Sequence, residues 1–132
     1  MNKRMKRYVL SGLVTAIVIV LSVLPFSDMP DLSNIPFWDK WVHFVMYGGL
    51  CSVYWFDYFR NGNKRNEWRK WLLWIVALPI ALGGLLELAQ KYLTTYRSGD
   101  WMDFLANSLG VLLAIPLGLF VINLLADKTK TV

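Results

Sequence analysis

The chain has 132 residues, of which 56% are apolar, 15% are aromatic and only 17% are charged, and its mean hydropathy is +0.41. This balance is too apolar for a soluble domain of that length and indicates an all-α integral membrane protein with one domain, residues 1–132. The net charge of +5 does not indicate a nucleic-acid partner, because the basic residues lie in short clusters that flank apolar runs. With one cysteine, Cys51, the chain has neither an intrachain disulfide nor a cysteine metal motif.

Four apolar runs predict four transmembrane helices, at about residues 8–26, 37–59, 71–93 and 101–126. The first run has no charged residue over a length of about 28 Å, close to the ~30 Å hydrocarbon core. A basic head before an apolar run also begins a signal peptide, but this run is long for one and no A-x-A-like site follows. The first run is therefore interpreted as a retained helix. Prolines at 25, 30 and 36 end it, and Asn-Gly-Asn at 61–63 predicts the next turn.

The positions of Lys and Arg predict the orientation. If the N-terminus is cytoplasmic, eleven basic residues lie on the inner side, and three, Lys40, Lys91 and Arg97, lie on the outer side. All seven tryptophans fall near predicted helix ends, as in an interfacial aromatic belt. Both patterns predict a four-helix bundle with a cytoplasmic N-terminus and a cytoplasmic C-terminus.

Polar residues gather at the predicted outer ends of the second, third and fourth helices. Helical spacing puts them on shared faces, as with Asp39, His43 and Tyr47, which are four residues apart. Carboxylates this deep are costly in hydrocarbon and persist mainly when they are paired or face a polar cavity. The predicted binding site comprises Asp39, Lys40, His43, Tyr47, Glu87, Gln90, Arg97, Asp100, Asp103 and Asn107.

Simpler roles compete with a functional one. Asp39 and Asp100 are placed to cap helix N-termini, and Lys91 is placed to extend from a helix C-terminus toward the interface. Glu87, His43 and Asn107 lie too deep to be caps, although a buried ion pair can simply hold helices together. Arg97 is the expected counter-ion, because its planar guanidinium can hold two carboxylate oxygens. Asp57 and Cys51 carry no functional signal.

Small residues spaced by four, Gly110, Ala114 and Gly118, predict a seam on the fourth helix that another helix can approach closely. A homo-oligomer through this seam is one expectation.

The order of these motifs resembles the VanZ-like family. The resemblance covers about residues 36 to 118 and is carried by Asp39-Lys40-x-x-His43-Phe44-x-x-Tyr47, then Glu87-x-x-Gln90, then Arg97-x-x-Asp100-x-x-Asp103-x-x-x-Asn107-x-x-Gly110. It implies a small multi-pass protein of the bacterial cytoplasmic membrane. The member that gives the family its name is linked to low-level resistance to the glycopeptide teicoplanin, a link that does not define a biochemical activity.

Three functions fit this pattern. The first is a binding module without cofactor or metal, whose partners are membrane lipids or a lipid-linked or lipophilic envelope molecule, with Arg97, Lys40 and Lys91 holding an anionic head group. The second is an intramembrane enzyme with His43, Glu87 and Asp103 as the catalytic candidates, either as acid and base or as a weak metal set. The third is proton-coupled transport with Glu87 as the titrating group. Because no nucleophile motif is present, the first is favoured and an enzyme is disfavoured.

Overall fold

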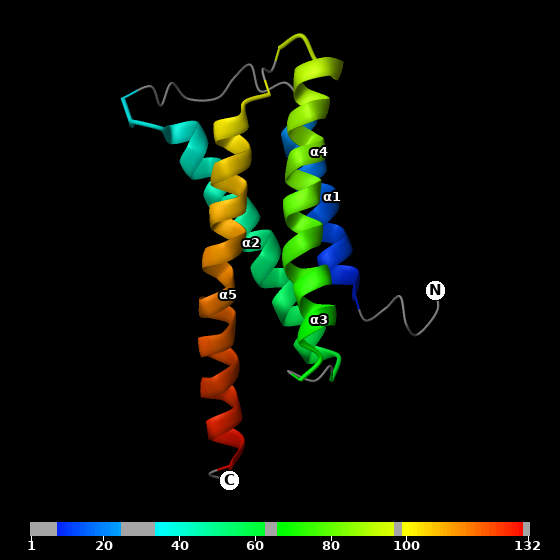
Figure 1. The fold of residues 1–132 in the computed structure, drawn as a ribbon, viewed down its shortest axis with the longest axis vertical. Helices are drawn as coiled ribbons and strands as arrows, with labels where there is room; N and C mark the ends of the chain where they lie inside the picture. Colours follow the sequence, from blue (N-terminus) through cyan, green and yellow to red (C-terminus); the bar gives the residue numbers. More distant parts are fainter. Residues whose placement is uncertain (1–7, 25–33, 63–65, 97–98, 131–132) are drawn as a thin grey trace.

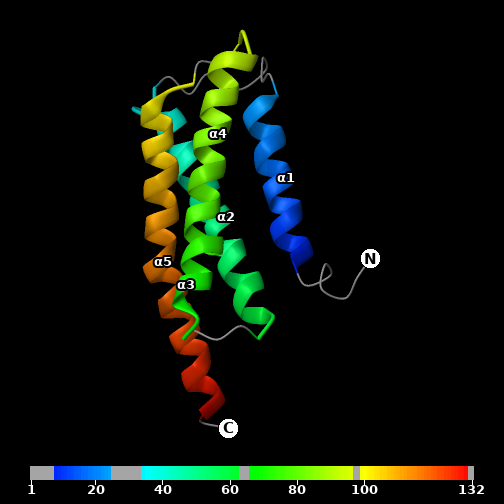
Figure 2. The same ribbon diagram turned by 45° about the vertical axis from the view of Figure 1, so that its right-hand side comes forward.

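The computed structural model describes residues 8–24, 34–62, 66–96 and 99–130, and every regular element in these ranges is helical. The elements are α1 (Val9–Val23), α2 (Trp38–Arg60), α3 (Trp68–Trp71), the π-helical segment η2 (Leu72–Ala77), α4 (Leu78–Leu93) and α5 (Trp101–Lys130). Because α3, η2 and α4 are continuous, the described part forms four rods that run roughly along one axis (Figures 1 and 2). The predicted all-α class is confirmed.

The ends of the rods follow local backbone chemistry. Leu24 ends α1 in an extended conformation with ψ of 142°, because a residue before proline, here Pro25, is disfavoured in the helical region. Gly62 ends α2 with φ of +78°, a left-handed conformation that glycine adopts without a Cβ clash. The first helix is therefore shorter than predicted. The third rod begins earlier than predicted, at Trp68, and the fourth helix continues beyond its predicted end to Lys130. Positions 25 and 26 of the predicted first helix lie outside the described residues.

The π-helical segment η2 lies just before Pro79. Proline has no backbone N–H and its ring collides with the carbonyl four residues earlier, which here belongs to Ile75. That carbonyl accepts a hydrogen bond from Cys51 Sγ of α2 at 3.2 Å, while Leu78 N–H donates to Leu73, five residues back. Cys51, which the sequence analysis set aside, thus satisfies a buried backbone acceptor.

Helix α2 is the centre of the bundle, because it packs against α1, η2, α4 and α5. Its closest crossing is with α5. A Cβ at Gly110 would overlap the carbonyl oxygen of Phe44, and a Cβ at Gly48 would lie 3.3 Å from the carbonyl oxygen of Gly110. Gly118 packs on the ring of Trp55 in the same interface.

The small-residue seam of α5 is thus used inside the chain, with Ala114 also buried. A homo-oligomer through these residues would have to displace α2.

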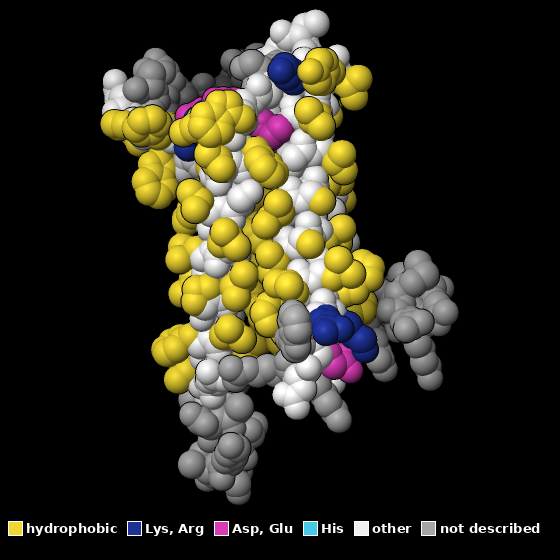
Figure 3. All heavy atoms as spheres, in the orientation of Figure 1, with side chains coloured by type: hydrophobic (Ala, Val, Ile, Leu, Met, Phe, Trp, Pro, Cys, Tyr) yellow, Lys and Arg dark blue, Asp and Glu magenta, His cyan; other side chains and the backbone are white. Residues whose placement is uncertain are grey.

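On the face drawn in Figure 3, hydrophobic side chains cover the bundle between two ends that carry charged side chains. Two segments, Arg69–Leu93 and Trp101–Leu124, are long and apolar enough to cross a membrane, and only 33% and 28% of their apolar windows are buried. A core helix of a soluble protein would be mostly buried instead. The α1 helix, with 15 residues, is about 22 Å long, and α2 carries charged residues at both of its ends.

Candidate functional site

A polar cluster lies where the N-terminal ends of α2 and α5 meet the C-terminal end of α4, at the top of Figure 1. We use the name polar cluster for six residues: Lys40 and His43 from α2, Glu87 from α4, Asp100 before α5, and Asp103 and Asn107 from α5. Five of these six residues have side chains that are mostly buried; Asp100 is 40% exposed. Burying several ionisable groups in one layer costs desolvation free energy, which is offset because each group has a polar partner.

His43 is at the centre of the polar cluster. Its Nδ1 donates a hydrogen bond to Oδ1 of Asn107 at 2.9 Å, and Asn107 is fully buried. The carboxylates of Glu87 and Asp103 flank the ring, with Glu87 Oε1 3.6 Å from Nδ1 and Asp103 Oδ2 3.6 Å from Nε2. With Nδ1 bonded to the amide oxygen, Nε2 is the ring atom left to meet Asp103 or a ligand.

Lys40 is held by carboxylates on two helices. Its Nζ lies 2.5 Å from Asp39, 3.2 Å from Asp100 and 2.6 Å from Asp103. An ammonium shared by three carboxylates is already neutralised, so the expectation that Lys40 holds an anionic head group is not supported. Lys91, the second expected anion ligand, instead lies over the ring of Tyr92 at 5.4 Å.

Asp100 is the N-cap of α5. Its Oδ1 accepts a hydrogen bond from the backbone N–H of Met102 at 3.0 Å, as the capping interpretation anticipated. This hydrogen bond and the ammonium of Lys40 keep the pKa of the Asp100 carboxyl below its usual value. The backbone N–H of Asp100 donates to Glu87 Oε2 at 3.1 Å, so one residue links the cap of α5 to the buried carboxylate of α4.

Glycines allow these ends to approach. A Cβ at Gly83 would lie 3.1 Å from Nδ2 of Asn107 and 3.2 Å from the ring of Tyr47. A Cβ at Gly99 would overlap the backbone carbonyl of Glu87. Any larger residue at position 99 would push the start of α5 away from α4 and pull the Asp100 N–H from its carboxylate partner.

Three of the ten predicted site residues are not among the six residues of the polar cluster, and a fourth is not described. Gln90 turns away from the polar cluster and donates to the backbone carbonyl of Ser22 in α1 at 2.7 Å. Tyr47 is buried beside Gly83 and packs under the polar cluster. Asp39 is exposed, with 63% of its side chain accessible, and contacts Lys40 alone among the cluster residues. Arg97 lies outside the described residues.

A second polar contact, at the opposite end of the bundle, was missed by the sequence analysis. Asp57 is fully buried, and its Oδ2 accepts hydrogen bonds from both the backbone N–H and the hydroxyl of Ser11, each at 2.7 Å. Because Ser11 lies in the first turn of α1, its N–H has no partner inside that helix. The available signal was a carboxylate inside an apolar helix, with Arg60 one turn later, 2.9 Å from Oδ1.

Together, the fold and the polar cluster define a class: an all-helical protein with an apolar exterior and a buried histidine–carboxylate cluster at one end. Comparison with known families assigns the chain more narrowly. The VanZ/LLP1 family model matches residues 3–125, and the chain belongs to that family. No curated protein and no solved structure matches it.

Proposed function

We propose that this VanZ-family chain is a multi-pass protein of the bacterial cytoplasmic membrane, with both termini cytoplasmic, whose polar cluster binds a lipid-linked or lipophilic envelope molecule. The two apolar helices and the positive-inside pattern support the membrane location and the orientation. In that orientation the polar cluster lies at the outer leaflet, where cell-wall precursors and the lipid tails of glycopeptides reside.

The observation that carries this proposal is the surplus of carboxylates in the polar cluster. Among the residues that the structure describes, Glu87, Asp100 and Asp103 lie together with one ammonium, that of Lys40. Carboxylates only accept hydrogen bonds, so the ligand group that fits them best is a donor, such as an amine or a set of sugar hydroxyls. A donor head group would replace the ammonium of Lys40 or share its carboxylates.

The surroundings of the polar cluster suit an amphiphile. Large apolar side chains are exposed on the same ends of α2 and α5, among them Trp41, Val45, Trp101 and Leu105. An amphiphile could place its polar head at the carboxylates and its apolar chain along these side chains, which matches the usual design of a small-molecule site.

Isosteric neutralisation tests the proposal. Glu87→Gln and Asp103→Asn remove charge and keep shape, and Glu67→Gln at the opposite end is the matched control. We expect the two cluster variants to fold, to retain at least tenfold less of the envelope lipid that co-purifies with the wild-type protein, and to change the teicoplanin sensitivity of expressing cells. The proposal fails if folded cluster variants match the control in both lipid retention and sensitivity.

A second candidate function, metal-assisted catalysis, rests on one observation. Ligand atoms of His43, Glu87 and Asp103 all lie within 4.8 Å of one another, and one histidine with two carboxylates can bind zinc. The hydrogen bond from Nδ1 to Asn107 leaves Nε2, which faces Asp103 at 3.6 Å, as the ring nitrogen that could bind a metal. The ammonium of Lys40 on Asp103 weighs against it. Elemental analysis of protein purified with added Zn²⁺ decides: a stoichiometric metal that His43→Gln removes supports this function, and no metal eliminates it.

Proton-coupled transport through Glu87 is the weakest of the three. Between the polar cluster and Asp57 the described core holds apolar side chains such as Leu50, Ile75 and Val111 together with the hydroxyl groups of Tyr47 and Tyr54. None of the described core residues in that stretch is a histidine or a carboxylate.

A further inference from the structure

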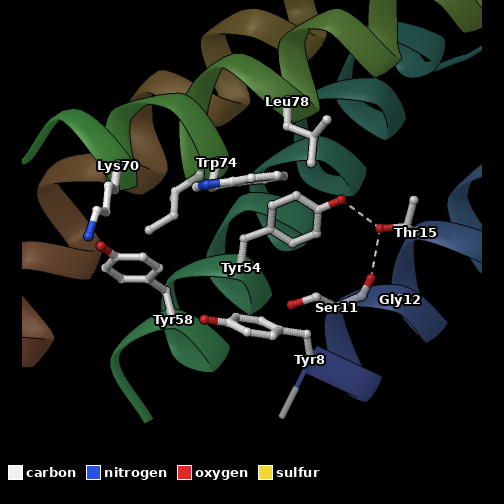
Figure 4. A pocket seen from close by; sticks show the side chains of 10 residues that line it. Tyr8, Ser11, Gly12, Thr15, Tyr54, Tyr58, Lys70, Trp74 and Leu78 are labelled. Carbon is white, nitrogen blue, oxygen red and sulfur yellow. Dashed lines mark hydrogen bonds between the residues drawn. The ribbon is translucent and has the colours of Figure 1, made fainter. Parts of the chain in front are cut away.

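A groove opens at the opposite end of the bundle from the polar cluster, between α1 and the rod formed by α3, η2 and α4. It encloses about 770 Å³, within the range of pockets that hold small molecules. Residues of three rods line it: Ser11, Gly12 and Thr15 of α1, Tyr54 and Tyr58 of α2, and Trp74 of η2 (Figure 4). We call this space the α1 groove.

Hydrogen bonds keep the α1 groove open. Helix α1 is tied to α2 by the paired Ser11–Asp57 contacts, each 2.7 Å, and by a 2.6 Å hydrogen bond between Thr15 Oγ1 and the Tyr54 hydroxyl. At the other end Gln90 ties α1 to α4. Figure 2 shows α1 and α4 diverging from that end toward the N-terminal end of α1. Since α1 is fixed on α2, it does not close against η2, and a chain lying in the space would gain dispersion contacts with its apolar walls.

The wall of the α1 groove contains the π-helical segment. Trp74 and Ile75 of η2 both line the space, and π-helical turns are frequent at functional sites. The lining side chains of η2 and α4 are apolar, with Trp74 and Leu78 exposed, which suits a hydrocarbon chain.

One end of the α1 groove is polar and basic. Lys70 lines it beside Tyr58, with the amine and the phenol hydroxyl at the same end (Figure 4). The side chain of Lys70 is 67% exposed and contacts Glu67 at 3.1 Å, which leaves donors of the ammonium available. The chain from Arg60 to Lys70 contains five basic residues and one acidic residue, and basic segments next to apolar spans attract anionic lipids.

We propose that the α1 groove is a binding site for an anionic phospholipid. One acyl chain lies between α1 and η2, and the phosphate is held at the basic end by Lys70. This site is separate from the polar cluster and does not depend on the function proposed for it.

Filling the α1 groove tests the acyl-chain part of this site. A Cβ at Gly12 meets nothing within 4 Å, and Gly12 lines the groove, so the side chain of Gly12→Phe begins in open space and can extend into the groove. Gly49 on α2 is also in open space but lies outside the groove, so Gly49→Phe is the matched control. In native mass spectrometry of delipidated protein with added phosphatidylglycerol, we expect one tightly retained lipid for the wild type and for Gly49→Phe. Gly12→Phe is expected to retain at least tenfold less.

Changing Lys70 tests the phosphate part. Lys70→Gln is expected to weaken phosphatidylglycerol binding about fivefold, as for one charge near a lipid surface, and to leave phosphatidylcholine binding unchanged, whereas Lys70→Arg keeps the preference. Because Lys70 is exposed, its substitution is not expected to disturb folding, so the Lys70 variants test the proposal even if Gly12→Phe does not fold. The proposal is overturned if folded Gly12→Phe retains the lipid as the control does. It is also overturned if the wild type binds the two lipids equally, or if Lys70→Gln keeps the preference.

Discussion

The crossing of α2 and α5 at Gly110 gives a sharp test of the packing, through Gly110→Ala. The added Cβ would overlap the carbonyl oxygen of Phe44 and would lie 3.0 Å from the backbone nitrogen of Gly48. These are backbone atoms, which cannot rotate away, so the two helices would have to separate by about 1 Å. A gap of that size loses about a quarter to a half of the dispersion energy of the contacts it opens.

The expected change in stability has two parts of opposite sign. Overpacking costs about 1–3 kcal/mol, and the backbone contact places Gly110→Ala at the upper end of that range. Replacing a helical glycine with alanine contributes about 1 kcal/mol of stability in return, so the net loss is about 2 kcal/mol. Gly49→Ala, where the Cβ meets open space, should gain about 1 kcal/mol. The two alanines therefore differ by about 3 kcal/mol.

Unfolding by sodium dodecyl sulfate in mixed micelles, followed by circular dichroism, measures this difference. A second readout reports on the polar cluster: Asn107 lies one turn before Gly110, so helix separation should lengthen its hydrogen bond to His43, now 2.9 Å. Nitrogen-15 signals of the imidazole would shift in Gly110→Ala and stay in place in Gly49→Ala. Equal stability of the two variants would refute the close crossing.

Three other changes test local parts of the structure. Cys51→Ala leaves the Ile75 carbonyl without its donor and should lower the unfolding free energy by about 1–3 kcal/mol. Cys51→Ser, which keeps a donor, should recover most of that stability. An equal loss of stability in the alanine and serine variants would contradict the hydrogen bond. Asp57→Asn should cost about 1–3 kcal/mol and more than Ser11→Ala, which keeps the backbone N–H on the carboxylate; the reverse order in the same unfolding titration would contradict this. The lowered pKa of Asp100 gives stability that is present above the unfolded pKa of about 4 and lost as pH falls through the lower folded value. Asp100→Asn keeps a side chain that can cap the helix and should reduce the loss of stability on acidification. If the unfolding free energy of this variant falls with pH as it does in the wild type, the Asp100 carboxylate is not the source of that loss.

The sequence by itself determined the helical class and the end of the bundle at which most polar residues lie. Apolar runs bounded by prolines and basic clusters specify where helices begin and end, and a spacing of three or four residues specifies which side chains share a face. His43, Glu87 and Asp103 could therefore be assigned to one layer on neighbouring helix ends, with Asn107 one turn deeper, and the structure brings these four together.

Only the tertiary structure decided which partner each polar group meets, because helical spacing does not fix the rotation of one helix against another. Gln90 shares the end of α4 with Glu87, yet it faces α1 and bonds to Ser22. Lys40 was free to reach a ligand as far as the sequence could tell, but its flexible stem carries the ammonium to three carboxylates. Asp57 gains its buried partner from a helix more than forty residues away, a contact that no local pattern encodes.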